Sequence, residues 1–417
     1  MASEVRAARP PLDEVLAASL RVRDEQGLLR RLRPVEARAG ALVRVDGRDL
    51  VNVASNDYLG LSTHPALAEA AGVAMRDWGS GSAASRLVSG SLAPHHHLEE
   101  AIADWQHTEA AIAFSSGFAA ASGTIPALVG PGDLVLLDRL SHACCIDAAM
   151  ASGATWRPFR HNDPDHLGHL LRQADSKGAG KRPRILVITE SVFSMDGDVA
   201  PLAEIVELKE QHGAWLLVDE AHASGLHGAS RAGMAERLGL SDRIDIHLGT
   251  LGKAVGAAGG FIAGSRTLVD WLVNSARSFV FSTAPPPSVA AAAAAGIQII
   301  RSAEGASLAE AVWRRIDRLA ARMPVPVRSP MSAILPWIVG DAKVTLGVAE
   351  SLMEAGFLAP AIRYPTVPRG TARIRIALSA AHSDEHVEQL AGALGSMAGN
   401  MGSHGVMVVT MGTSPHP

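Results

Sequence analysis

Short apolar runs alternate with helical stretches between residues 56 and 285, and this alternation restricts the fold more than any other feature of the sequence. The runs, such as LVLLD at 134–138 and AWLLVD at 214–219, are apolar at nearly every position. Such strands are buried on both faces, which is typical of parallel sheets whose crossover helices cover both sides. The pattern predicts an α/β fold with a large, mostly parallel sheet domain.

The segments on either side of this region have other patterns. Residues 11–38 are rich in Leu, Arg and Glu, which predicts one or two helices, and Asp46-Gly47 between two alternating runs is a hairpin signal. Beyond STAPPPS at 282–288, helical patterns and the alternating run ARIRIALSA predict a smaller α+β domain. The last residues have no period and predict a flexible tail. The predicted parts are an N-terminal arm and hairpin at 1–55, the large domain at 56–285, the small C-terminal domain at 286–399 and the tail at 400–417.

Composition excludes several classes of function. Lys and Arg number 38 against 42 Asp and Glu, without a long run of one charge, so we expect no nucleic-acid partner. Cys144 and Cys145 are adjacent and poorly placed to form a disulfide, which favours a reducing, cytoplasmic setting. The N-terminus lacks the apolar stretch of a signal peptide, and the apolar run at 289–300 is too short to cross a bilayer. We therefore expect no membrane partner.

The letters Asp219-Glu220-Ala221-His222 spell a motif found in nucleic-acid helicases. A helicase also needs a phosphate-binding loop of the form G-x-x-x-x-G-K-[ST]. Neither Gly180-Lys181 nor Gly252-Lys253 has the required neighbours. The sequence therefore argues against an ATP-driven motor.

A different chemistry follows from where these residues lie along the predicted strands. Asp219 ends one strand, and Lys253 follows the next, with Thr250 just before it. Ligands of open α/β sheets bind at the carboxyl ends of strands, so both side chains should face one site. Pyridoxal phosphate (PLP) requires a lysine for its Schiff base and a carboxylate for its pyridine nitrogen. His222 could then reach the phenolic oxygen of the ring.

Two further turns fit the same cofactor. Gly117 and Phe118 begin a helix directly after a strand, and a helix N-terminus suits an anionic phosphate. His142 lies just beyond another strand, where its imidazole could stack on the ring. Each feature alone also suits an ordinary turn or a capping residue. Together with Asp219 and Lys253 they indicate a PLP enzyme.

Taken together, these motifs resemble the α-oxoamine synthases, PLP-dependent enzymes that condense an amino acid with an acyl thioester and release carbon dioxide. The resemblance spans about residues 28–396 and implies a fold-type-I PLP transferase. It is strongest to the members that join L-alanine to a pimeloyl thioester, carried by coenzyme A or by an acyl carrier protein. The motifs that carry it are SNDYLGL, GSGSAASRLVSG, SSGF, LSHACCIDA, ESVFSMDGDVAPL, VDEAHASG, GTLGKAVG, FSTAPPPS and AIRYPTVPRGTARIRIALSAAHS.

The resemblance also implies roles for individual residues. Lys253 is the cofactor lysine, Asp219 the partner of the pyridine nitrogen, His222 that of the ring oxygen, and His142 the stacking group. The other implied cofactor contacts are Gly117, Phe118, Ser194 and Thr250, with Ser282 and Thr283 reaching the phosphate of a second subunit in a homodimer. The implied substrate contacts are Arg30 for the acyl group, Arg363 and Thr366 for the amino-acid carboxylate, and Asn56 and His142.

The sequence departs from the family pattern at two loops. Ala83 and Ala84 stand where a Gly-Gly pair is common, and Tyr364 stands where proline is usual. Both loops face substrate, so the acyl chain stays open, and so do the activities of other α-oxoamine synthases. An aminotransferase or a catalytically silent PLP-binding regulator would share Asp219 and Lys253. We expect no metal site at the histidine run 95–97, because adjacent helical side chains diverge.

Overall fold

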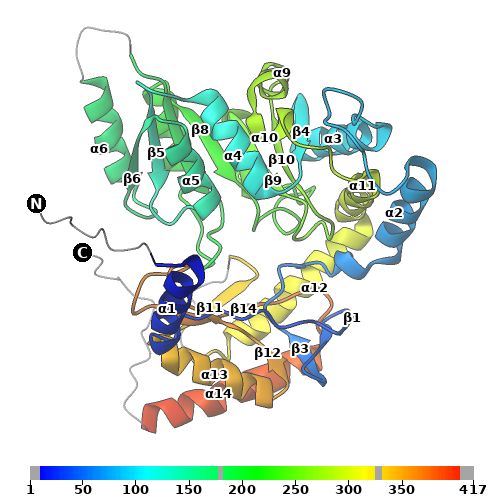
Figure 1. Cartoon of the computed structure of the whole chain (residues 1–417), viewed down its shortest axis with the longest axis vertical. Helices are drawn as coiled ribbons and strands as arrows, with labels where there is room; N and C mark the ends of the chain where they lie inside the picture. The colour runs from blue at the N-terminus through cyan, green and yellow to red at the C-terminus, as the bar shows by residue number, and fades with distance from the viewer. Residues whose placement is uncertain (1–9, 177–181, 325–330, 404–417) are drawn as a thin grey trace, which may run out of the picture.

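The computed structural model describes residues 10–176, 182–324 and 331–403. Its large domain contains a seven-stranded sheet in the order β4-β10-β9-β8-β7-β5-β6, in which β10 runs antiparallel to both of its neighbours and the others are mutually parallel (Figure 1). This confirms the predicted α/β class. The strands are β4 (Ala110–Phe114), β5 (Leu134–Asp138), β6 (Thr155–Phe159), β7 (Ile185–Glu190), β8 (Trp215–Asp219), β9 (Ile246–Thr250) and β10 (Gly260–Gly264).

Alternate residues of the central strands face two separate cores. Val135 and Leu137 pack against one set of helices, while Leu136 packs against another, as the two-residue period of a strand requires. Helices therefore cover both faces of the sheet. The first set is α4 (Gly117–Leu128), α5 (Ala143–Ala151), α9 (Arg266–Ser275) and α10 (Arg277–Val280), and the second is α6 (Pro164–Asp175), α7 (Leu202–Gln211) and α8 (Met234–Arg237).

Long helices connect the large domain to a smaller one. The apolar run at 289–300 lies in α11 (Pro287–Arg301), which packs on α2 (Pro65–Trp78) and α3 (Ala93–Gln106) and is followed by α12 (Ala303–Ala320). The small domain has a sheet in the order β11-β14-β13. Its elements are β11 (Ile334–Gly340), α13 (Ala342–Glu354), β12 (Phe357–Leu358), β13 (Ala361–Ile362), β14 (Ala372–Ala377) and α14 (Asp384–Ser403).

The N-terminal hairpin packs with the small domain. Strands β2 (Leu42–Val45) and β3 (Arg48–Asn52) flank the predicted turn, where Asp46 and Gly47 both have positive φ, as a tight two-residue hairpin needs. Strand β1 (Ala37–Ala39) pairs with β2, and β3 pairs in parallel with β12. Residues 1–55 thus contain strands that complete a sheet of the C-terminal part of the chain.

The remaining elements are short or exposed. The predicted arm contains one helix, α1 (Leu12–Glu25), with no buried residue, and two short 3₁₀ helices occur at Leu61–Thr63 and Ser241–Arg243. The C-terminal helix α14 ends at Ser403, so the predicted tail at 400–417 begins too early, and residues 404–417 lie outside the described ones. Within the described ranges, every helix is too short or too polar to span a bilayer.

Candidate active site

Four neighbouring strands deliver polar groups to one end of the large sheet. His142 follows β5, Glu190 ends β7, Asp219 ends β8, and Lys253 follows β9. Parallel strands β7 and β8 pair Glu190 with Asp219 directly. The carboxyl ends of the strands therefore gather these residues, as predicted for Asp219 and Lys253.

A chain of hydrogen bonds runs through the predicted lysine. The Lys253 Nζ atom lies 2.8 Å from His222 Nε2, and His222 Nδ1 lies 2.6 Å from the hydroxyl oxygen of Tyr58. Tyr58 is fully buried. Because a buried phenol and imidazole need partners, this chain fixes the orientation of the His222 ring beside the lysine amine.

Burial shifts the ionisation of these groups. The Lys253 side chain is only partly exposed, and burial lowers the pKa of its amine, although Asp219 and Glu190 oppose that shift. Burial also lowers the pKa of His222 well below its usual value, with Lys253 acting in the same direction. A neutral amine and a neutral imidazole are the forms that nucleophilic and proton-transfer chemistry requires.

Two carboxyl groups share this region. Burial raises the pKa of Asp219, and the amide of Ala221 donates to its Oδ1 atom at 2.9 Å. Burial and the charge of Asp219 raise the pKa of Glu190 to about 8. Among the described residues, Glu190 Oε1 has no hydrogen-bond partner, while Oε2 accepts from the Ser194 amide at 3.2 Å. This carboxyl pair suits a cationic ring nitrogen, which would stabilise the ionised form.

His142 occupies the start of α5 and lies near both cysteines. Its Nδ1 atom accepts from the Cys144 amide at 3.3 Å and lies 3.0 Å from the Cys144 sulfur. The contact with Cys144 raises the pKa of His142 to about 9. The capping role weighed from the sequence is therefore present, and the ring also lines the cavity described below.

One group of potential metal ligands lies in the described part of the chain. Cys144, Cys145 and Asp219 have ligand atoms within 4.8 Å of one another. The same Asp219 carboxylate is the group expected to hold the cofactor nitrogen.

In the histidine run, His95 contacts the Pro285 carbonyl at 2.8 Å and His96 contacts the Ser91 hydroxyl at 2.9 Å, so these two rings serve different partners.

The start of α4 faces the end of β9. Ser116 caps the helix by accepting from the Ala119 amide, which leaves the amides of Gly117 and Phe118 without partners inside the helix. A Cβ atom added to Gly117 would lie 3.7 Å from the Thr250 side chain. Helix amides beside a threonine hydroxyl form a site suited to a phosphate group.

Arg375 is a functional residue that the sequence interpretation did not select. Its Nη2 atom donates to Asn56 Oδ1 at 3.0 Å and to the Tyr58 hydroxyl at 3.3 Å, and its Nε atom donates to the Ser194 carbonyl at 2.5 Å. Arg375 is buried, and no carboxylate pairs with it within the described ranges. A buried guanidinium with only neutral partners is suited to receive a carboxylate from a ligand.

A cavity of about 560 Å³ opens in front of His142. Ser194 and Thr366 lie on its other walls, and Tyr364, with the Arg369 guanidinium 4.4 Å from its ring centre, lies at the exposed side. The lining comes from residues 139–143 and 146 after β5, residues 193–196 after β7, and residues 364–368 between β13 and β14. A larger cavity of about 650 Å³ lies near the opposite ends of the strands and contains none of the predicted site residues.

The structure brings Arg30 and Thr366 together but places Arg363 differently from expectation. The Arg30 guanidinium donates to the Thr366 hydroxyl at 3.0 Å. The Arg363 guanidinium donates to the carbonyl oxygens of Gly27 and Leu29, and so ties the N-terminal arm to the small domain. None of the contacts found for Arg363 is with Asn56, His222 or Lys253.

The other predicted contacts lie at the surface of the single chain. Ser282 is partly exposed, and Thr283 is exposed and pairs with Ser85 in an isolated β-bridge. Next to this bridge, Ala83 has a φ of +57°, a conformation in which glycine is less strained. The departure from Gly-Gly noted in the sequence thus coincides with a left-handed backbone.

The chemistry of these groups fits PLP. The Gly117 and Phe118 amides, which have no partner inside α4, suit the phosphate; the Asp219–Glu190 pair suits the pyridine nitrogen, and the lowered pKa of Lys253 suits the carbonyl carbon. His222, with Nε2 directed at the amine, suits the neighbouring phenolic oxygen.

Comparisons with known proteins agree with this arrangement. Residues 48–394 match the family described as aminotransferase class I and II. An 8-amino-7-oxononanoate synthase of Geobacter sulfurreducens is 44% identical over 394 residues, which cover 93% of this chain and 98% of that protein. The synthase of the same name from Anaeromyxobacter dehalogenans (strain 2CP-1) is 44% identical over 391 residues, which cover 94% and 96% of the two chains.

Solved structures also match almost end to end. Serine palmitoyltransferase from Sphingomonas wittichii superposes with a TM-score of 0.86 at 31% identity, covering 94% of this chain and 98% of that one. An 8-amino-7-oxononanoate synthase from Francisella tularensis superposes with a TM-score of 0.71 at 24% identity, covering 86% and 99%. The second likeness concerns the fold alone.

Proposed function

Since the chain belongs to the aminotransferase class I and II family, and within it to the 8-amino-7-oxononanoate synthases of biotin biosynthesis, we propose that it condenses L-alanine with a pimeloyl thioester. The products are 8-amino-7-oxononanoate, carbon dioxide and the free thiol. One observation carries the proposal: Lys253, His222 and Asp219 lie in one site, and the buried guanidinium of Arg375 lies beside them.

PLP, when bound, supplies an electron sink for the pair left on the amino-acid carbon by a departing proton or carboxylate. Asp219 would hold the proton on the ring nitrogen, and its burial would make that ion pair strong. With Tyr58 donating to Nδ1, His222 would carry its proton on Nε2 and would donate it to the ring oxygen. Lys253, with its lowered pKa, takes the α-proton of L-alanine at Nζ and later returns a proton to the product carbon.

The two carboxylates of the substrates fit different arginines. The carboxylate of L-alanine fits Arg375 better than Arg363, because Arg375 is joined through Tyr58 to His222 while Arg363 holds the arm. The distal carboxylate of the pimeloyl chain fits the mouth of the cavity, where Arg30 and Thr366 meet. Arg363 adds positive charge there. Burial, and to a smaller extent the charge of Arg30, lowers the pKa of Arg363.

The test is an assay of thiol and carbon dioxide release from the purified protein with PLP. L-alanine with pimeloyl-CoA should give a much higher kcat/KM than glycine with acetyl-CoA or succinyl-CoA, or L-serine with palmitoyl-CoA. A higher value for any of those three pairs would assign the chain to another α-oxoamine synthase activity. Transfer of the amine to a keto acid without thiol release would instead indicate an aminotransferase, and PLP binding without turnover a silent regulator.

The Arg375 assignment needs its own measurement. Arg375→Lys keeps the charge but loses the planar fork that matches a carboxylate, so we expect KM for L-alanine to rise roughly 10-fold or more. Arg363→Lys should leave KM for L-alanine nearly unchanged. The reverse order of effects would restore Arg363 as the alanine-binding arginine.

The quaternary and cellular context are part of the proposal. A homodimer would bring Ser282 and Thr283 of one subunit to the phosphate site of the other, which agrees with their exposure or partial exposure in the single chain. Light scattering during size-exclusion chromatography tests this, and a monomer at working concentration would refute it. Two reduced cysteines and a balanced charge support a cytoplasmic enzyme, whose acyl donor is carried by coenzyme A or by an acyl carrier protein.

A further inference from the structure

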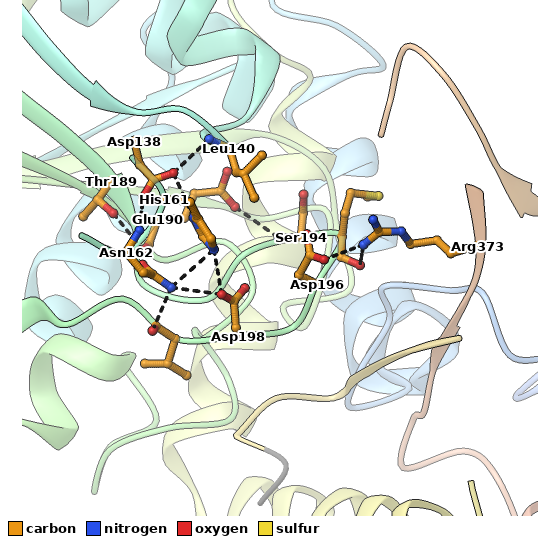
Figure 2. A network of polar contacts seen from close by, with 12 residues as sticks. Asp138, Leu140, His161, Asn162, Thr189, Glu190, Ser194, Asp196, Asp198 and Arg373 are labelled. Atoms are coloured by element: carbon orange, nitrogen blue, oxygen red, sulfur yellow. Dashed lines mark hydrogen bonds and ion pairs between the residues drawn. The ribbon is translucent and has the colours of Figure 1, made fainter. Parts of the chain in front are cut away.

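His161 lies between the carboxylates of Asp138 and Asp198 (Figure 2). Its Nδ1 atom is 2.9 Å from Asp138 Oδ1 and its Nε2 atom is 2.7 Å from Asp198 Oδ2. Burial lowers the pKa of the ring, but the hydrogen bonds to Asp138 and Asp198 outweigh burial and raise the pKa to about 10. At neutral pH both ring nitrogens therefore carry protons and donate, one to each carboxylate.

One of these carboxylates supports the segment that carries His142. Asp138 ends β5 and is fully buried. Its Oδ1 atom accepts from the Leu140 amide at 2.8 Å, and its Oδ2 atom accepts from the Asn162 amide at 2.9 Å. Asp138 thus shapes the turn that leads into His142 and holds that turn to the loop of His161.

The other carboxylate belongs to the loop that carries Ser194. The side-chain amide of Asn162 donates from Nδ2 to Asp198 Oδ2 at 2.9 Å and to the Val199 carbonyl at 3.2 Å. The His161 ring also meets the Phe193 ring edge-on, with centroids 4.4 Å apart. Because Phe193 and Ser194 line the cavity, His161 holds that wall by a charge pair and by an aromatic contact.

The small domain holds the same loop from the other side. Arg373 donates to Asp196 at 2.5 Å and to the Met195 carbonyl at 3.1 Å (Figure 2). Arg375 donates to the Ser194 carbonyl. The loop is therefore held by β14 on one side and by His161 and Asn162 on the other.

We propose that His161 is a positioning residue: it fixes the spacing between the His142 segment and the Ser194 loop, which form facing walls of the cavity. His161 does not line the cavity itself, so it acts through those two segments. This role rests on the proposed function. In that reaction the acyl carbon must lie within ~3–3.5 Å of the attacking carbon, and a shift of about 1 Å costs roughly 100-fold in rate.

The experiment compares His161→Gln with His169→Gln. A glutamine amide can reach one carboxylate but cannot bridge both, whereas His169 is exposed and, among the described residues, its side chain hydrogen-bonds only to Gln173. We expect His161→Gln to lower kcat for thiol release roughly 10- to 100-fold, with KM for L-alanine changed less than about twofold. The control should match the parent protein.

Two further readouts separate this role from simple structural support. Visible circular dichroism of bound PLP should change in His161→Gln, since His142 shifts against the ring. Amide hydrogen exchange of residues 191–200 should accelerate in the protein without cofactor. Asp198→Asn, whose side chain is 40% exposed, is the second variant and should give the same changes in smaller measure.

The outcomes are distinct. Unchanged kcat, dichroism and loop exchange in both variants, with only lower stability, would overturn the positioning role. A parent protein that releases no thiol from any thioester would refute the proposed function, while dichroism and loop exchange would still decide the role of His161.

Discussion

Replacement of Tyr58 by phenylalanine removes one oxygen atom from the centre of the site. The hydroxyl lies 2.6 Å from His222 Nδ1, 3.2 Å from Asn56 Oδ1 and 3.3 Å from Arg375 Nη2. Arg375 keeps its bonds to Asn56 and Ser194, so the loss falls mainly on His222. The variant therefore tests whether the tyrosine sets which nitrogen of His222 carries the proton.

The size of the effect follows from burial. Leaving one buried polar group without its partner costs about 1–3 kcal/mol, and Tyr58 and His222 are both buried. We expect the free energy of unfolding to fall by that amount. If His222 donates to the cofactor oxygen in the transition state, kcat/KM falls by a similar energy, and about 1.4–2.7 kcal/mol corresponds to roughly 10- to 100-fold.

The assay measures thiol release from pimeloyl-CoA with L-alanine, the absorbance spectrum of bound PLP, and equilibrium unfolding. Thr345→Val is the matched control, because it removes a buried hydroxyl that donates to the Asp341 carbonyl on α13. The control should lose stability and keep its kcat/KM and spectrum. Equal kcat/KM in Tyr58→Phe and the parent would refute the reasoning about His222.

Four further outcomes are expected. Borohydride reduction of the PLP-loaded protein should label Lys253, and a label found on another lysine by mass spectrometry would exclude the role of Lys253. Asp219→Asn should retain PLP but lose most of its kcat, measured by thiol release. Ala83→Gly should raise the free energy of unfolding by up to ~1 kcal/mol in denaturant, since glycine relieves the positive φ. The pKa of His161 in the folded protein is raised to about 10, so its charge stabilises the fold fully below the ordinary histidine pKa near 6.5, and this stabilisation is lost as the pH rises towards 10. The free energy of unfolding, measured from pH 6 to 10, should therefore depend less on pH in His161→Gln than in the parent protein.

The large sheet was predictable because its strands are local in sequence. The run indicated at 134–138 forms β5, and the run indicated at 214–219 contains β8. Asp219 and Lys253 were predictable for the same reason, since the end of a strand is visible in the sequence and parallel strands bring their ends together. The antiparallel direction of β10 was not, because direction depends on which neighbours a strand finds.

Arg375 shows what the sequence could not supply. In ARIRIALSA the arginines alternate with isoleucines, which is the pattern of a strand with one face in water. In the structure Arg373 and Arg375 are buried, because the loop at 194–196 packs over that face. The loop and the strand are far apart in the sequence, so no local pattern reports their contact. A buried arginine on a polar face is recognised only after folding.

Because β3 pairs with β12, the N-terminal hairpin cannot complete its sheet until residues 357 and 358 have been synthesised. Val51 pairs with Phe357, so 357 − 51 = 306 further residues must be made before β3 can pair with β12. At ~5–20 residues per second this takes roughly 15–60 s, while the strands between 110 and 264 can already assemble. Through that interval Val43, Val45 and Leu50 lack Leu358, which covers them in the finished protein. These three apolar side chains of the opening segment therefore stay uncovered on that side until residue 358 has been synthesised.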